Sequence, residues 1–164
     1  VMSKVGSDWE SGKISVGTEH VASNIAHTLV KSIMEPVNRR VNKKKILICV
    51  PIGEEHHLGC DVLETYLSMN CFEVFNMCTS VPTESILNFI DDNNPDIVLI
   101  SITISDNIDP GRRLVRKINK EFDIPVLVGG LAVQENTSLK FGGKIIGDLS
   151  LSDIKKKIGC EING

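Results

Sequence analysis

The stretch Lys45–Gly59, KILICVPIGEEHHLG, joins an unbroken apolar run directly to a short polar loop. Its first part, Ile46–Val50, predicts a strand that is buried on both faces, as in a parallel sheet. Pro51 ends this strand, and the loop that follows carries two glutamates and two histidines between glycines. Ligands of open α/β sheets bind beyond the carboxyl ends of the strands. We therefore expect this loop to present polar side chains at a ligand-binding edge.

Downstream of this loop, strand-like and helix-like patterns alternate to the end of the chain. The apolar runs that predict further strands lie at Phe72–Met77, Asp96–Ser101, Val126–Val128 and Lys144–Ile146. The segments with helical spacing lie at Leu58–Met69, Pro82–Asn93, Ile108–Phe122, Leu131–Leu139 and Leu151–Ile158. This alternation predicts an α/β fold, a doubly wound five-stranded parallel sheet of the Rossmann-like or flavodoxin-like kind. We expect the strand order 2-1-3-4-5, which reverses between the first and third strands.

The segment before the sheet differs, because Ser15–Val37 carries apolar residues at helical spacing and predicts one long helix. Val1–Gly17 shows little periodicity, so we expect no second long helix before the sheet. The apolar stripe of the long helix is wide enough to need a partner. Either this helix packs on the sheet domain, or it belongs to a helical bundle of which the chain holds only a part. We accordingly expect a helical cap at 1–42 and a sheet domain at 43–164.

A second face of the same helix is polar. His20, Asn24 and His27 lie on it, since positions seven apart nearly eclipse each other on a helix. From the residues alone, the expected interpretation is a face exposed to solvent rather than a ligand site.

Composition is that of a globular domain and excludes several classes of protein. With 164 residues, 41% of them hydrophobic, the chain can bury one core. It has no apolar run near the ~20 residues of a membrane helix and no signal peptide, so we expect no membrane association and a cytoplasmic location. The net charge of −3 argues against direct nucleic-acid binding. The five cysteines lack C-x-x-C spacing, so we expect reduced thiols rather than a zinc or redox site.

Three loops are expected to meet at the carboxyl edge of the sheet: Gly53–Gly59, Ser101–Asp106 and Gly129–Leu131. They supply imidazoles, hydroxyls and bare backbone, respectively. Neither G-x-G-x-x-G nor G-x-x-x-x-G-K-[ST] is present, which excludes the usual dinucleotide and triphosphate sites. A hydrolase would need a G-x-S-x-G elbow, which the sequence lacks. A phospho-receiver domain would need an aspartate where this chain has Ser101, so neither class is supported. The aromatic content of 4% disfavours flavin stacking.

Short motifs in these loops resemble the fingerprint of the cobalamin-binding Rossmann-like domain, which reads D-x-H-x-x-G, S-x-L and G-G. The matching residues are Glu54-Glu55-His56-His57-Leu58-Gly59, Ser101-x-Thr103 and Gly129-Gly130. The resemblance implies that His56 coordinates cobalt from the lower face and is the metal ligand. Glu54 would orient the His56 imidazole and raise its basicity, while Gly59 leaves room for the nucleotide tail. His57 is the rival ligand, but the spacing to Gly59 favours His56.

The same resemblance assigns parts to the other loops. Ser101 is expected to hydrogen-bond the buried benzimidazole, and Gly129 and Gly130 to line the slot for the tail. The remaining loop positions expected to contact the cofactor are Thr103, Ser105 and Leu131. Two positions depart from the family pattern: Glu54 replaces an aspartate and has a longer reach, and Thr103 replaces a leucine, which makes the corrin side smaller and more polar.

The amino-terminal segment carries a second resemblance. Trp9, followed after nine residues by Glu19-His20, is similar to the motif of the CarH/LitR-type cobalamin-dependent photoreceptors. In that family the motif caps the upper face of the cofactor. The resemblance implies that Trp9 covers a 5′-deoxyadenosyl group and that Glu19 and His20 contact this group or the corrin rim. Well-known members have a histidine where this chain has Glu10, and that histidine can take the upper cobalt position after photolysis. In this chain His20 or water would have to take that position.

Two functions follow from these resemblances. The first is a cobalamin-binding sensor that detects light through photolysis of adenosylcobalamin and is coupled to transcriptional regulation. It would form a homo-oligomer and reach DNA only through a domain absent from this chain. The alternative is a corrinoid carrier of a cobalamin-dependent methyltransferase system, with methylcobalamin as cofactor. Both are binding functions, so we expect no enzyme activity and no catalytic residue in the chain itself.

Overall fold

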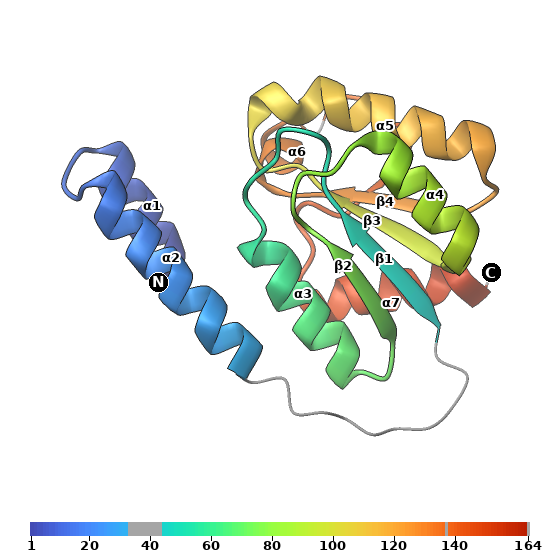
Figure 1. Ribbon diagram of the computed structural model, residues 1–164, viewed down its shortest axis with the longest axis horizontal. Coiled ribbons are helices and arrows are strands. Elements are labelled where there is room, and N and C mark those ends of the chain that lie inside the picture. The colour runs from blue at the N-terminus through green and yellow to red at the C-terminus, as the bar shows by residue number, and fades with distance from the viewer. Residues whose placement is uncertain (33–43, 137, 164) are drawn as a thin grey trace.

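The computed structural model describes residues 1–32, 44–136 and 138–163, and a five-stranded sheet lies at its centre (Figure 1). The strands are β1 (Lys45–Cys49), β2 (Glu73–Met77), β3 (Ile97–Ser101), β4 (Val126–Gly129) and β5 (Lys144–Ile145). All neighbouring strands are parallel, and their order is β2-β1-β3-β4-β5. This confirms the predicted fold and strand order, with the reversal between β1 and β3.

Helices cover both faces of the sheet. The helices are α1 (Met2–Glu10), α2 (Val16–Ser32), α3 (Leu58–Met69), α4 (Thr83–Asn93), η1 (Ser105–Asn107), α5 (Ile108–Glu121), α6 (Leu131–Glu135) and α7 (Leu151–Asn163). One core cluster joins the sheet to α4, α5 and α6, and a second joins it to α3 and α7. Figure 1 shows α4 and α5 on the opposite side of the sheet from α3.

The central strand β1 explains why the apolar run is unbroken. Leu47 and Cys49 belong to the cluster under α4 and α5, whereas Ile46 and Ile48 belong to the cluster under α3 and α7. These four residues are at most 1% exposed. Successive side chains of a strand point to opposite faces, so a strand covered on both sides has no position left for a polar residue.

The amino-terminal segment forms a short helix, α1, that the sequence analysis did not identify. Met2, Val5 and Trp9 recur at spacings of three and four, which is helical, but the signal spans only two turns and is diluted by Gly6. α1 turns back on α2, and the resulting pair lies beside α3 (Figure 1). Trp9 and the Glu19-His20 pair therefore stand on two different helices.

The apolar stripe of α2 is only partly covered. Val21, Ile25 and Leu29 are 55–60% exposed, whereas Ala22 and Ala26 are half-buried. Of the two alternatives for this stripe, packing on the sheet domain does not apply to its larger residues. Helix α2 contacts both α1 and α3, while these larger residues stay exposed.

Parts of two predictions lie outside the described residues. Residues 33–37 of the predicted long helix are not described. The expected boundary between residues 42 and 43 also lies outside the described residues and stays a prediction.

Two helix ends differ from expectation. α6 ends at Glu135 because Asn136 donates its side-chain amide to the Ala132 carbonyl at the helix end. α7 continues to Asn163, since Ile162 packs on the same cluster as Ile158.

Gly130 is a position at which the fold requires glycine. Its φ is +104°, and a Cβ there would lie 2.3 Å from the carbonyl oxygen of Ile102. The backbone after β3 therefore crosses the start of α6 at a distance that excludes any side chain. The Ala132 N–H donates to the same Ile102 carbonyl at 3.2 Å, which fixes the two loops together.

We predict that Gly130→Ala lowers the free energy of unfolding by at least about 1–3 kcal/mol, because alanine meets both the backbone clash and the strained φ. Urea denaturation of the cofactor-free chain measures this. Gly59→Ala is the matched control, since nothing lies within 4 Å of a Cβ there and the residue is helical. We expect this control to leave stability unchanged or to raise it by up to about 1 kcal/mol. Equal stability of the two variants would contradict the close approach.

Candidate functional site

The carboxylate of Glu54 ties together the loops that follow β1 and β3. This residue is only 1% exposed. Its Oε2 accepts hydrogen bonds from the backbone N–H of Thr103 at 2.8 Å, from that of Ile104 at 3.1 Å and from the Asn107 side-chain amide at 3.1 Å. Three donors from one loop therefore surround one oxygen of a buried anion, as the burial of a charge requires.

The other carboxylate oxygen holds His56. Oε1 of Glu54 accepts the His56 backbone N–H at 3.1 Å and lies 3.1 Å from the imidazole Nδ1. An ionised carboxylate can only accept, so Nδ1 carries the proton and the lone pair of the neutral ring stands on Nε2. The His56 side chain is 60% exposed. The geometry thus presents an imidazole that is fixed from behind and has a donor nitrogen available in front.

The pKa of Glu54 reflects this environment. Burial tends to raise it, but the hydrogen bonds from Thr103, Asn107, the His56 backbone and Ile104 outweigh burial, so the pKa lies below its usual value of 4.5. Glu54 is therefore ionised at neutral pH and remains an acceptor for the His56 ring.

The loops after β3 and β4 place the other predicted residues at the same edge. Ser101 ends β3 opposite Gly129 in β4 and is half-buried. Its hydroxyl has no hydrogen-bond partner among the residues that the structure describes. Thr103 is half-buried, while Ser105 and Leu131 are exposed. A free hydroxyl at the sheet edge is what recognition of a polar heterocycle requires.

The three predicted glycines differ in what surrounds them. Nothing lies within 4 Å of a Cβ built on Gly59, so this glycine faces open space beside α3. A Cβ on Gly129 would lie 3.1 Å from the Ile146 side chain, and the space at Gly130 is filled by the Ile102 backbone. The missing side chain of Gly130 thus makes room for the protein's own backbone rather than for a ligand. Of the three positions, only Gly59 leaves room for a ligand in this way.

The helical cap carries a charged group of its own. Glu19 accepts a hydrogen bond from the Ser23 hydroxyl at 2.6 Å and pairs with Nδ1 of His20 at 2.9 Å. These two bonds are the main reason that the pKa of Glu19 lies below its usual value. Trp9 on α1 is 45% exposed.

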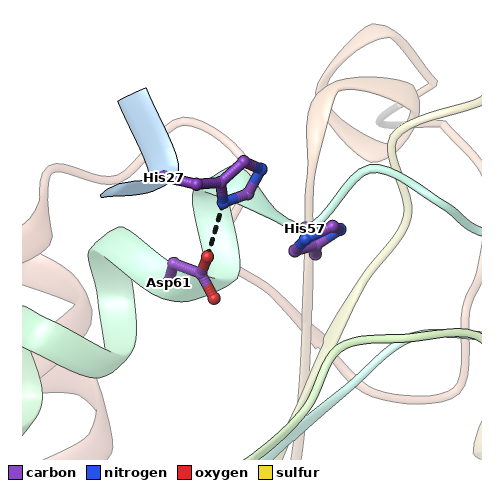
Figure 2. Close-up of side chains that lie close together, drawn as sticks. All are labelled: His27, His57 and Asp61. Carbon is purple, nitrogen blue, oxygen red and sulfur yellow. Dashed lines mark hydrogen bonds and ion pairs between the residues drawn. The ribbon is translucent and has the colours of Figure 1, made fainter. Parts of the chain in front are cut away.

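A second group of polar residues was missed from the sequence. His27 of α2, His57 at the start of α3 and Asp61 in its first turn come together, as Figure 2 shows. Nδ1 of His27 lies 2.6 Å from Oδ2 of Asp61, and the His27 and His57 rings stack at 4.3 Å. The expectation that His27 faces solvent is wrong, because its side chain is 19% exposed. His20 and Asn24 are exposed as expected.

No spacing rule could have found this group. His27 and Asp61 are separated by 34 residues, and only the packing of α2 on α3 makes them neighbours. A polar cavity of about 490 Å³ adjoins them. Its lining residues are Lys31, His57, Asp61, Glu64, Thr65, Asn76, Cys78 and Thr79. None of Ser101, Gly129 and Gly130 lines this cavity, so it is separate from the predicted slot for the tail.

Fold and site together define a class of protein. A doubly wound sheet carries, at its point of reversal, a histidine whose outward nitrogen is free to donate to a metal. The family described as "B12 binding domain" matches residues 44–146, which is more than half of the chain, and the chain belongs to that family. It is a cobalamin-binding domain, as the loop motifs predicted. Such a domain is a binding or carrier module rather than a catalyst, in agreement with the expectation of no enzyme activity.

Known proteins extend the likeness beyond the matched residues. The trimethylamine corrinoid protein of Methanosarcina barkeri is 23% identical over 99% of this chain and 77% of its own length. The structure of the monomethylamine corrinoid protein of the same organism covers 97% of this chain and 78% of its own, with 17% identity and a TM-score of 0.74. The methanol:cobalamin methyltransferase complex MtaBC of that organism has 19% identity, covers 99% of this chain and 64% of its own, and gives a TM-score of 0.66.

These comparisons support cobalamin binding but not the narrower resemblance to light-responsive regulators. The relatives named above are corrinoid proteins or a methyltransferase complex. None of the helices in the described part of the chain is long and apolar enough to cross a membrane. The predicted cytoplasmic location, the homo-oligomer and a link to DNA stay predictions.

We predict that Glu54→Gln destabilises the cofactor-free chain at neutral pH by about 1–3 kcal/mol, because the amide turns a donor toward groups that need an acceptor. A carboxyl group with a lowered pKa stabilises the fold fully above pH 4.5 and loses this effect as the pH falls through its folded-state pKa. The difference between wild type and variant should therefore shrink in acid. Urea denaturation between neutral and acidic pH measures it, with the exposed neighbour variant Glu55→Gln as control. A difference that grew in acid would contradict the assignment.

Proposed function

We propose that this chain is a corrinoid carrier, which holds cobalamin at the carboxyl edge of its sheet and presents the upper face of the cofactor to a methyltransferase. The observation that carries this proposal is the pair formed by buried Glu54 and outward-facing His56. The printed names of the relatives support the carrier over the light sensor. When bound, cobalamin supplies a cobalt centre that accepts and releases a methyl group.

In this proposal His56 would hold the cobalt of the cofactor. Its Nε2 carries the lone pair, while the Glu54 carboxylate accepts a hydrogen bond from Nδ1–H and increases the electron donation of the ring. Because Glu54 is itself fixed by three donors from the loop after β3, the imidazole has a defined direction before any cofactor binds. This reduces the ordering cost of binding.

The nucleotide tail is assigned to the space beside Gly59 and the hydroxyl of Ser101. The open surroundings of Gly59 support this assignment, and so does the unpartnered hydroxyl of Ser101 within the described part of the chain. The Ser101 hydroxyl would donate a hydrogen bond to a benzimidazole nitrogen of the tail. Gly129, Thr103, Ser105 and Leu131 are assigned to the rim of the same site. Gly130 is assigned to positioning the loop, since the Ile102 backbone occupies its free side.

The cap residues Trp9, Glu19 and His20 are assigned to the upper face. His27 of α2 stacks on His57, the residue next to His56, which supports a position of α2 near the edge where the cofactor would bind. Trp9 is nearly half exposed and offers an aromatic surface to a flat ligand. A carrier must uncover this face when its partner enzyme binds, so the cap would move relative to the sheet domain.

We predict that His56 supplies the axial nitrogen of the bound cofactor. The full chain is labelled with ¹⁵N-histidine and loaded with cobalamin, which is then reduced by one electron for electron paramagnetic resonance. Nitrogen hyperfine splitting should change with the label in the wild type. His57→Ala should keep this change, and His56→Ala should lose it. If the label has no effect in the wild type, the axial nitrogen comes from the cofactor's own base and the assignment of His56 is wrong.

Light separates the carrier from the sensor. The chain is loaded with adenosylcobalamin in the dark, illuminated, and compared before and after by visible absorption and size-exclusion chromatography. A carrier should photolyse without a change of elution volume, because no oligomer contact depends on the adenosyl group. A change of elution volume on illumination would support the light sensor with adenosylcobalamin and would contradict the carrier with methylcobalamin.

A further inference from the structure

We propose that His27, His57 and Asp61 form a binding site for a divalent transition-metal cation that joins α2 to α3, separate from the assigned cobalt ligand His56. Figure 2 shows the three side chains together. One ligand atom from each of the three residues lies within 4.8 Å of the others. Two imidazoles and one carboxylate are a recurrent ligand set for zinc and for other first-row cations.

The distances require only a small rearrangement. Ligand nitrogen and oxygen atoms lie about 2.0–2.2 Å from zinc, so in a tetrahedral site they stand roughly 3.4 Å apart. Nδ1 of His27 and Oδ2 of Asp61 are 2.6 Å apart and share a proton. A cation would take the place of this proton, and these two atoms would move apart to admit it. Side-chain movements on the order of 1 Å are sufficient for this, and for the third ligand atom to approach from within 4.8 Å.

Neighbouring groups hold two of the three ligands in place. The Nδ1–H of His57 donates to the carbonyl of Glu55 at 2.9 Å, which leaves the lone pair of that ring on Nε2. The other oxygen of Asp61 accepts from the Asn76 side-chain amide at 3.1 Å, and this amide also donates to Glu64 at 2.7 Å. Outer hydrogen bonds of this kind orient the ligands of natural metal sites.

Burial and charge favour a cation at this place. The side chain of Asp61 is 5% exposed and that of His27 is 19% exposed. The adjoining cavity carries the carboxylates of Asp61 and Glu64 and one ammonium group, that of Lys31, so its formal charge is negative. The cavity is also large enough to supply water as the remaining ligand.

The thiol in the cavity does not compete as a ligand at neutral pH. A hydrogen bond with Cys60 and then burial raise the pKa of Cys78 far above its usual range, so its sulfur stays protonated. A nitrogen and oxygen ligand set remains. Since His27 belongs to the cap and the other two residues to the sheet domain, a bound cation would fix α2 against α3.

The test uses the full, untagged chain, stripped of metal and free of cobalamin, with Zn²⁺ as the probe. Isothermal titration calorimetry should give one zinc ion per chain, and zinc should raise the thermal midpoint. His27→Ala and Asp61→Asn should each weaken zinc binding by more than about tenfold. Asp109→Asn, a remote and exposed change on α5, should not alter the zinc affinity. Far-UV circular dichroism verifies that each variant is folded.

Two further measurements identify the ligands. Co²⁺ in place of zinc should give an absorption spectrum without sulfur-to-metal charge transfer, which excludes the exposed cysteines Cys71 and Cys160 as ligands. His56→Ala should keep its zinc affinity even where it loses the cobalt ligand, so failure of this site and failure of the carrier function are distinguishable. Zinc binding of equal strength in the wild type, His27→Ala and Asp61→Asn would overturn the proposal. So would the absence of any binding heat in the wild type.

Discussion

The buried carboxylate of Glu54 is the interaction on which the candidate site depends. A desolvated anion is stable only when hydrogen-bond donors surround it, and here there are five. Three come from the loop after β3, and the other two are the backbone N–H and the imidazole of His56 in the loop after β1. The same bonds fix the end of β1 against the end of β3. The direction of the His56 ring is thus a consequence of satisfying a charge. A rigid imidazole at a sheet edge suits a metal ligand better than a free one on a mobile loop.

The sheet provides the edge at which this is possible. Because the strands are parallel, the loops that follow β1 and β3 start at the same edge of the sheet, and the reversal of strand order between these two strands separates the loops there. The close approach of the Ile102 backbone to Gly130 then draws the loop after β4 against the loop after β3. Three separate segments are in this way held within reach of one ligand.

The cap is joined to the sheet domain by a different kind of contact. Helix α2 exposes Val21, Ile25 and Leu29, and its His27 is hydrogen-bonded to Asp61 of α3. A polar, half-buried contact of this sort is specific in geometry but depends on what surrounds it, since water, a proton or a cation can each satisfy the same groups. The proposed metal site and the proposed movement of the cap both concern this contact.

Local patterns were sufficient to predict the sheet, its strand order and the loop that bears His56, because buried strands and glycine-bounded loops are recognisable in short stretches of sequence. The pairing of Glu54 with that histidine was implied by the resemblance of the loop to the cobalamin-binding motif. Helix α1 was missed because two turns carry too little periodic signal, and the burial of His27 was missed because it depends on the angle at which α2 meets α3. Contacts such as those of Glu54 with Thr103, or of His27 with Asp61, join residues far apart in the chain. Only the tertiary structure decides them, because no local preference records which distant surfaces will meet.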